Sequence, residues 1–137
     1  MKRILVGYDG SDHAAKAYAM AVDLAVKYGA ALEVVCVARP PEPPEMVETE
    51  AILENAQEHF EEEFKTLRTQ AKSVGLRPEL TVRVGHPADQ IVRRADETRA
   101  DLIVLGHRGK TLMQRWLLGS ISKRVVSYAH CAVLIVR

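Results

Sequence analysis

The chain has 137 residues, which is enough for one domain with a complete hydrophobic core. Hydrophobic residues make up 47% and charged residues 27%, as in soluble globular proteins, and the net charge of +1 provides no general attraction to nucleic acid or to a membrane. No apolar run approaches the roughly 20 residues of a membrane helix. With two cysteines and no signal peptide ahead of the first predicted strand, we expect a cytoplasmic protein with reduced thiols.

The first predicted elements are a buried strand and an amphipathic helix. Residues 3–9 are a short apolar run, as in a parallel strand that is buried on both faces. Ser11 is a good N-cap for a helix that continues to about Tyr28, and Gly29 is a good C-cap. The apolar positions of this helix recur every three or four residues, which predicts one buried face: Ala14, Ala17, Ala21, Leu24 and Tyr28.

A second strand, a proline-rich loop and a long acidic helix come next. Residues 31–37 predict the strand, and the prolines of residues 39–45 exclude helix and central strand, so we expect a mobile surface loop there. A helix from about Val47 to Val74 follows, with Gly75 as its cap. Its predicted buried face consists of Leu53, Ala56, Phe60, Phe64, Leu67 and Ala71. Its predicted solvent-exposed face includes Glu58, Glu61, Glu62 and Glu63.

The second half of the chain continues the alternation. Residues 79–84 alternate in polarity, as in an edge or half-covered strand, and Pro87 begins the next helix. Residues 102–105 predict a fourth strand, a helix runs from Ser120 to about Ala129, and residues 132–136 predict a fifth strand. The order βαβαβαβαβ predicts an α/β fold, with a parallel sheet, right-handed crossovers and helices on both faces. No linker or repeat indicates a second domain, so residues 1–137 are expected to form a single one.

Glycines and serines between the fourth strand and the last helix predict a phosphate site. Gly106, Gly109 and Gly119 let the backbone approach a ligand closely. The first amides of the helix that begins at Ser120 have no partner within the helix, and the helix dipole favours negative charge there. Ser122 adds a hydroxyl donor. Ligands of parallel sheets bind at the carboxyl ends of the strands, which is where this loop lies.

The surrounding sequence supports an anionic ligand but fits neither common phosphate motif. Residues 102–137 contain six basic residues and no acidic ones. The Walker A pattern fails because Val104 stands where its first glycine is required. The dinucleotide fingerprint G-x-G-x-x-G fails because two residues separate Gly7 from Gly10.

The whole chain resembles the universal stress protein family. The resemblance rests on residues 4–11, on residues 102–106 and on residues 133–136. Its most specific part is the spacing G-2x-G-9x-G-(S/T), which marks the ATP-binding branch of that family and is formed here by Gly106, Gly109, Gly119 and Ser120. The resemblance implies a Rossmann-like fold, similar to the adenine nucleotide alpha hydrolases, with strand order 3-2-1-4-5. It also implies an adenine nucleotide and a homodimer.

The same resemblance implies roles for individual residues. Asp9 and Val37 would lie at the adenine and ribose end of the ligand. The backbone of residues Gly106, His107, Arg108 and Gly109 would wrap the ribose and phosphates. The outer phosphates would be held by Gly119, Ser120, Ile121 and Ser122. From the residues alone, two other roles for Asp9 stay open: a magnesium ligand, or a cap of its own turn.

The fifth strand gives a physical reason for a homodimer. In the implied strand order this strand lies at the edge of the sheet, and Val133 to Val136 form an uncharged apolar run. An edge of this kind invites pairing and is usually covered. We therefore expect two copies to pair through residues 133–136.

These patterns predict a protein that binds an adenine nucleotide, ATP with Mg²⁺, and acts in regulation or stress response. No histidine or cysteine has the spacing of a protein-held metal site. Three alternatives stay open: a slow ATP hydrolase or nucleotidyl-transfer enzyme, an interaction module without a nucleotide, and a flavin-binding protein. Hydrolysis needs an oriented water, and Asp9 is the nearest carboxylate for that role.

Overall fold

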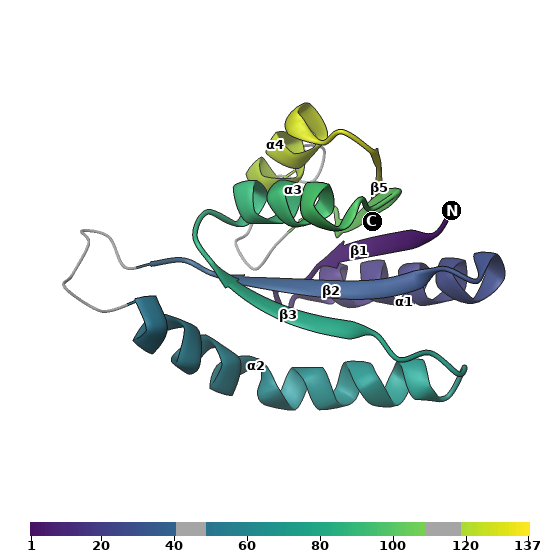
Figure 1. The fold of residues 1–137 in the computed structure, drawn as a ribbon, viewed down its shortest axis with the longest axis horizontal. Helices are drawn as coiled ribbons and strands as arrows, with labels where there is room; N and C mark the ends of the chain where they lie inside the picture. Colours follow the sequence, from purple (N-terminus) through teal and green to yellow (C-terminus); the bar gives the residue numbers. More distant parts are fainter. Residues whose placement is uncertain (41–48, 109–118) are drawn as a thin grey trace.

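The computed structural model describes residues 1–40, 49–108 and 119–137, and its parallel sheet has the strand order β3-β2-β1-β4-β5 (Figure 1). The predicted fold class and strand order are thus confirmed. In chain order the elements are β1 (Arg3–Gly7), α1 (Asp12–Tyr28), β2 (Ala31–Ala38), α2 (Thr49–Lys72), β3 (Glu79–Val84), α3 (Pro87–Thr98), β4 (Leu102–Gly106), α4 (Ser120–Tyr128) and β5 (Ala132–Val136).

Each face of the sheet carries its own core because side chains alternate across a strand. Ile4 and Val6 of β1 pack with residues of α1 and α2 in one core. Leu5 of β1 packs with residues of α3 and α4 in the other. Figure 1 shows the two helix layers, with α3 and α4 on one side of the strands and α1 and α2 on the other. The central strands β1 and β4 are therefore buried on both faces, as the unbroken apolar runs predicted.

The helix boundaries follow the capping signals in the sequence. The hydroxyl of Ser11 accepts a hydrogen bond from the amide of Ala14 at 3.1 Å, which caps α1. Gly29 adopts the left-handed conformation with φ 63° and ends α1. Pro87 is the first residue of α3, as expected. The predicted proline-rich loop lies mostly outside the described residues.

Helix α2 buries most of the predicted apolar face, with Leu53 only partly buried, but Glu63 does not lie on the solvent-exposed face as predicted. Glu58, Glu61 and Glu62 are exposed, as expected. Glu63 is partly buried and lies over Gly10 in the turn after β1, so that a Cβ added to Gly10 would collide with Oε1 of Glu63. Glu63 directly precedes the buried Phe64 and is turned toward the sheet rather than toward solvent.

Both cysteines are free thiols, and the one in β2 is fully buried. Burial raises the pKa of the Cys36 thiol above its usual value, and it does the same for Cys131. Among the helices in the described residues, none combines the length and the apolar character that crossing a membrane requires.

A buried glutamate in β2 was not identified from the sequence. Glu33 is 3% exposed and faces α3. Its Oε2 lies 2.7 Å from Nε of Arg94 and accepts a hydrogen bond of 2.8 Å from the hydroxyl of Thr81. Arg94 continues the network to Glu79 at 3.3 Å. A carboxylate removed from water needs such partners, so Arg94 makes this position tolerable for an acid.

We predict that Arg94→Ala destabilises the protein by about 2 kcal/mol, because Glu33 would keep its buried charge and lose its cationic partner. Urea unfolding of the purified variant measures the loss. The double substitution Glu33→Leu with Arg94→Leu is expected to recover most of it, since apolar pairs replace buried ion pairs at little cost. Equal stability of Arg94→Ala and the original protein would contradict this account of Glu33.

Candidate functional site

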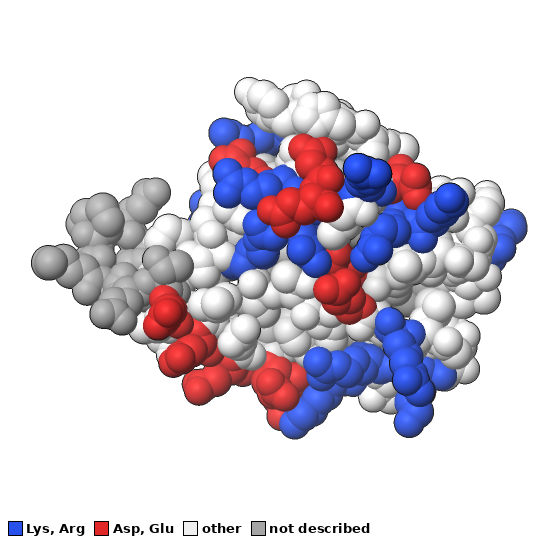
Figure 2. Space-filling model, in the orientation of Figure 1, with Lys and Arg blue, Asp and Glu red and all other residues white. Residues whose placement is uncertain are grey.

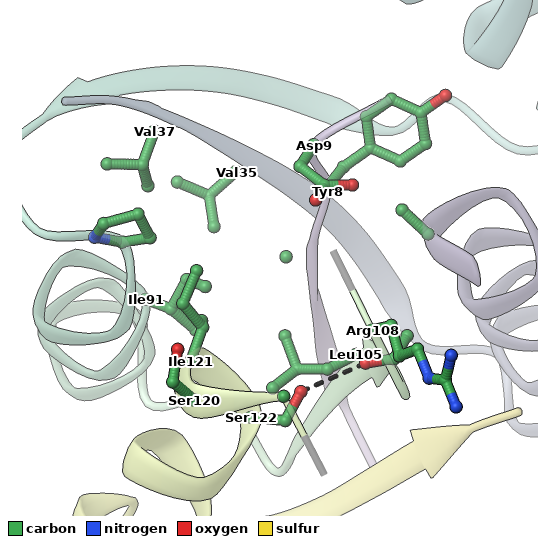
Figure 3. A pocket seen from close by; sticks show the side chains of 15 residues that line it. Tyr8, Asp9, Val35, Val37, Ile91, Leu105, Arg108, Ser120, Ile121 and Ser122 are labelled. Atoms are coloured by element: carbon green, nitrogen blue, oxygen red, sulfur yellow. Dashed lines mark hydrogen bonds between the residues drawn. The ribbon is translucent and has the colours of Figure 1, made fainter. Parts of the chain in front are cut away.

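A pocket opens at the carboxyl ends of β1 and β4, where α3 and α4 approach the sheet (Figure 3). Val35, Val37 and Ile91 form an apolar wall on one side, and Arg108 lies on the other. Its full lining consists of Gly7, Tyr8, Asp9, Ala14, Val35, Val37, Pro87, Ile91, Leu105, Gly106, Arg108, Gly119, Ser120, Ile121 and Ser122. The pocket therefore has the location expected for a ligand site in a parallel sheet.

The turn after β1 fixes a carboxylate at the mouth of this pocket. The amide of Ser11 donates a 2.9 Å hydrogen bond to Oδ1 of Asp9, and Gly10 between them has a positive φ of 82°. The amide of Tyr8 donates to the carbonyl of Val35 at 3.0 Å, which holds the end of β1 against β2. Asp9 is thus placed by backbone contacts on both sides of it, as a ligand-binding residue needs to be.

The predicted glycines Gly106 and Gly119 differ in what they do for the fold. A Cβ on Gly106 would lie 2.7 Å from the backbone carbon of His13, so the glycine allows the end of β4 to touch the first turn of α1. Gly119 has φ −59° and ψ 152°, which any residue can adopt, and an added Cβ would meet its nearest atoms at ordinary distances of 3.5 and 3.7 Å. Packing requires Gly106, whereas neither the conformation of Gly119 nor its packing against the described residues requires a glycine.

Helix α4 begins at the pocket and is tied to the end of β4. The amide of Gly119 donates to the carbonyl of His107 at 3.1 Å, and the hydroxyl of Ser122 donates to the carbonyl of Gly106 at 3.1 Å. Ser122 is only 5% exposed, so its hydroxyl is used for the hydrogen bond to Gly106. Ser120 is exposed, and the amides of residues 120–122 belong to the first helical turn, where amides have no acceptor within the helix.

His107 and Arg108, which lie between Gly106 and Gly109 in the sequence, differ in the structure, because only Arg108 lines the pocket. The side chain of His107 is 4% exposed and lies outside the pocket lining, with its ring centroid 6.2 Å from that of His13. Burial, followed by the charges of Arg137 and Arg108, lowers the pKa of His107, which favours a neutral ring. The Nε atom of Arg108 is buried and has no hydrogen-bond partner among the described residues.

The structure brings most of the predicted site residues together. Those that line the pocket are Asp9, Val37, Gly106, Arg108, Gly119, Ser120, Ile121 and Ser122. Gly109 lies outside the described residues. The sequence analysis missed the apolar wall residues Val35 and Ile91. Val35 belongs to the predicted second strand, and Ile91 lies near the start of α3, close to this edge of the sheet.

The charge of Glu63 acts on the residues near the turn after β1. Burial raises the pKa of Tyr8, and the charge of Glu63 on α2 adds to that rise. The carboxylates of Glu63 and Asp9 therefore lie near Tyr8, while Arg108 and the start of α4 line another part of the pocket. Within the described residues, no three side chains that bind metals cluster together.

Known proteins resemble the chain over its full length. A model of the universal stress protein family matches residues 1–137. Universal stress protein MJ0531 of Methanocaldococcus jannaschii is 37% identical over 139 residues, which span 99% of this chain and 82% of that protein. Among solved structures, universal stress protein UspA from Lactobacillus plantarum superposes with a TM-score of 0.89 at 26% identity, covering 99% of this chain and 97% of that one.

Two further similar structures contain nucleotides. One is a universal stress protein in complex with cAMP, with a TM-score of 0.79 at 29% identity, covering 99% of this chain and 97% of the other. The second is the universal stress protein from Archaeoglobus fulgidus in complex with dAMP, with a TM-score of 0.69 at 26% identity, covering 100% and 98%.

We predict stability effects of very different size for two glycine substitutions of the same kind. Gly106→Ala should cost about 2–3 kcal/mol, because the methyl group would press on the backbone of α1, which cannot rotate away. Gly119→Ala should change stability by less than about 1 kcal/mol, because a weaker N-cap and a less flexible unfolded chain offset each other. Chemical unfolding of both variants under identical conditions measures the difference, and equal losses would show that the two contacts are misjudged.

Proposed function

This chain belongs to the universal stress protein family, as its glycine spacing predicted, and on that premise we propose that it binds an adenine nucleotide in the pocket at the ends of β1 and β4. We further propose ATP with Mg²⁺ as the ligand and a regulatory role in stress response. In this proposal residues 1–137 act as one domain, since the first and last strands belong to a single sheet.

The observation that carries this proposal is the glycine at the start of α4. Gly119 lines the pocket, yet neither its dihedral angles nor its contacts with the described residues call for a glycine. A group that approaches the backbone from the pocket would account for the missing side chain. Because the adjoining amides are those of a helix N-terminus, an anion such as a phosphate is the group that fits.

The two sides of the pocket suit the two ends of an adenine nucleotide. Val35, Val37 and Ile91 offer an apolar wall for a flat base. In this proposal Asp9 would accept hydrogen bonds from the ribose hydroxyls. The amides of Ser120 to Ser122 would bind the phosphates, together with Gly109. Since His107 is buried away from the pocket, we assign its contribution to its backbone alone.

The ligand class is further supported by the similar structures that contain cAMP and dAMP. Both ligands share adenine and one phosphate, which is the part that the wall and the start of α4 would bind. ATP adds two phosphates, which would extend along the loop that follows Gly106.

Magnesium fits the site only as a companion of the nucleotide. Asp9 is the one carboxylate in the pocket lining of the described residues, and Mg²⁺ commonly uses one or two carboxylates, phosphate oxygens and water. Asp9 would therefore supply a single ligand or bind through water. The ion would neutralise the outer phosphates when bound.

We predict that nucleotide-stripped protein binds ATP with Mg²⁺ in calorimetric titration, and that Gly119→Ala weakens binding at least about tenfold while folding is retained. The methyl group would occupy the space that a phosphate needs. Gly109→Val tests the neighbouring part of the loop, and removing Mg²⁺ with EDTA tests the ion.

The matched control is Ser127→Ala, which lies at the far end of α4 and should bind ATP like the original protein. Titrations with AMP and cAMP rank the ligands. If the original protein binds no adenine nucleotide, the proposal fails. If Gly119→Ala binds normally, the phosphates are held elsewhere.

We also propose that two copies pair through the open edge of β5. Strand β5 pairs with β4 on one side. The carbonyl of Val136 accepts from the amide of His107 at 2.7 Å and so faces the β4 side. Because the polar groups of alternate residues face opposite ways, those of Val133 and Ile135 face the open edge. An apolar strand with unpaired edge groups is a ready template for a second strand.

We predict that the protein is a dimer by light scattering at micromolar concentration and that Ile135→Pro is a monomer. Proline removes an edge donor while leaving the hydrogen bonds to β4 in place. Ile135→Ala keeps the amide and is expected to remain dimeric. A monomeric original protein would exclude this interface.

A further inference from the structure

The exposed side of α2 carries charges that are separated by sign along the helix. Its first half presents acidic side chains, and its second half presents basic ones. The exposed residues of this stripe are Glu50, Glu54, Glu58, Glu61, Lys65, Arg68 and Lys72. Figure 2 shows the division along the lower edge of the molecule, where α2 lies, with acidic groups at one end and basic groups at the other.

The charges are arranged symmetrically about residue 63. Glu61 and Lys65 are each two positions from it, Glu58 and Arg68 are each five positions away, and Glu54 and Lys72 are each nine positions away. At 3.6 residues per turn all of them lie within about 80° around the helix. Glu63 itself points the opposite way, over Gly10, so the stripe faces away from α1 and outward.

The stability of a single helix does not explain this arrangement. Glu50, Glu54 and Glu58 are spaced four apart, as are Arg68 and Lys72, and like charges at that spacing destabilise a helix. The helix dipole favours acids at the start and bases at the end, but its effect falls off within one turn. Within the described part of α2, the ion pair that forms joins Lys65 and Glu62 at 3.4 Å, and it leaves the rest of the stripe unneutralised.

We propose that a second copy of this chain docks its α2 antiparallel to the α2 of the first copy. The two-fold axis would cross the charged stripe at the level of residue 63 along the helix. Each acidic position then faces a basic position of the other copy: Glu61 faces Lys65, Glu58 faces Arg68, and Glu54 faces Lys72. Every contact occurs twice because of the two-fold axis. The like-charge repulsions within each helix are offset by the opposite charges of its neighbour.

A groove at the end of α2 supports the same arrangement. It is lined by Arg68, Lys72, Gly75, Leu76, Arg77 and Pro78. In the antiparallel arrangement the partner's first turns, which carry Glu50 and Glu54, lie at this basic groove. The stripe is polar throughout, so the association is weak and depends on salt, as exposed ion pairs do.

This surface is separate from the nucleotide pocket and from the proposed β5 pairing. Strand β3, beside which α2 packs, and strand β5 are the two opposite edges of the sheet. The inference therefore does not rest on the proposed function. It can be tested in the Ile135→Pro variant as well as in the original protein.

The test is sedimentation velocity at about 20 mM and about 500 mM NaCl, which shortens the Debye length from about 20 Å to about 4 Å. We expect the average mass to be larger at low salt. Glu58→Lys places a lysine opposite Arg68 in two symmetry-related contacts, so this substitution should weaken the low-salt association at least about tenfold.

Two double variants with the same net charge separate this register from general charge effects. Glu58→Lys with Arg68→Glu restores the opposite charges of one pair, so it should restore association. Glu58→Lys with Lys72→Glu leaves two mismatched pairs, so it should not. Circular dichroism verifies that α2 stays helical in each variant. Equal association of both double variants, or no salt-dependent association of the original protein, would overturn the proposal.

Discussion

The binding edge depends on how closely the end of β4 approaches the start of α1. Only a glycine at position 106 leaves room for the backbone of His13, which a Cβ would meet at 2.7 Å. The carbonyl of the same glycine accepts the hydroxyl of Ser122, and the next amide, of His107, donates to β5. One residue and its neighbour thus join α1, α4 and β5, so the position of α4 above the pocket follows from the packing at Gly106.

Sequence patterns sufficed for the sheet and the helix ends, because each of these depends on local chemistry. The apolar runs of β1 and β4, the hydroxyl of Ser11 and the left-handed Gly29 act within a few residues of their own positions. The strand order came from the resemblance to a family, since pairing between distant strands leaves no local signal. The glycine spacing located the pocket, but it did not distinguish the packing glycine, Gly106, from Gly119, because that difference lies in what each Cβ would touch.

What the sequence could not supply involves partners that are distant along the chain. Glu33 and Arg94 are separated by 61 positions, and the sequence near Glu33 does not indicate that Arg94 is its partner. The inward turn of Glu63 depends on where the turn after β1 lies relative to α2. An acidic residue inside an apolar strand, such as Glu33, is still a usable signal, because a buried carboxylate requires a cation or several donors.

The two proposed contacts between copies have consequences when considered together. Each is two-fold symmetric, and they use opposite edges of one sheet, at β5 and beside β3. A protein with two such surfaces contacts two other copies, so its assemblies either close into a ring with an even number of copies or continue as a chain. An apolar strand edge is little affected by salt, whereas charged helices are screened by it. Ionic strength would therefore control the second contact alone, and a low-salt mass that stops at four copies would indicate that the two axes are oriented for closure.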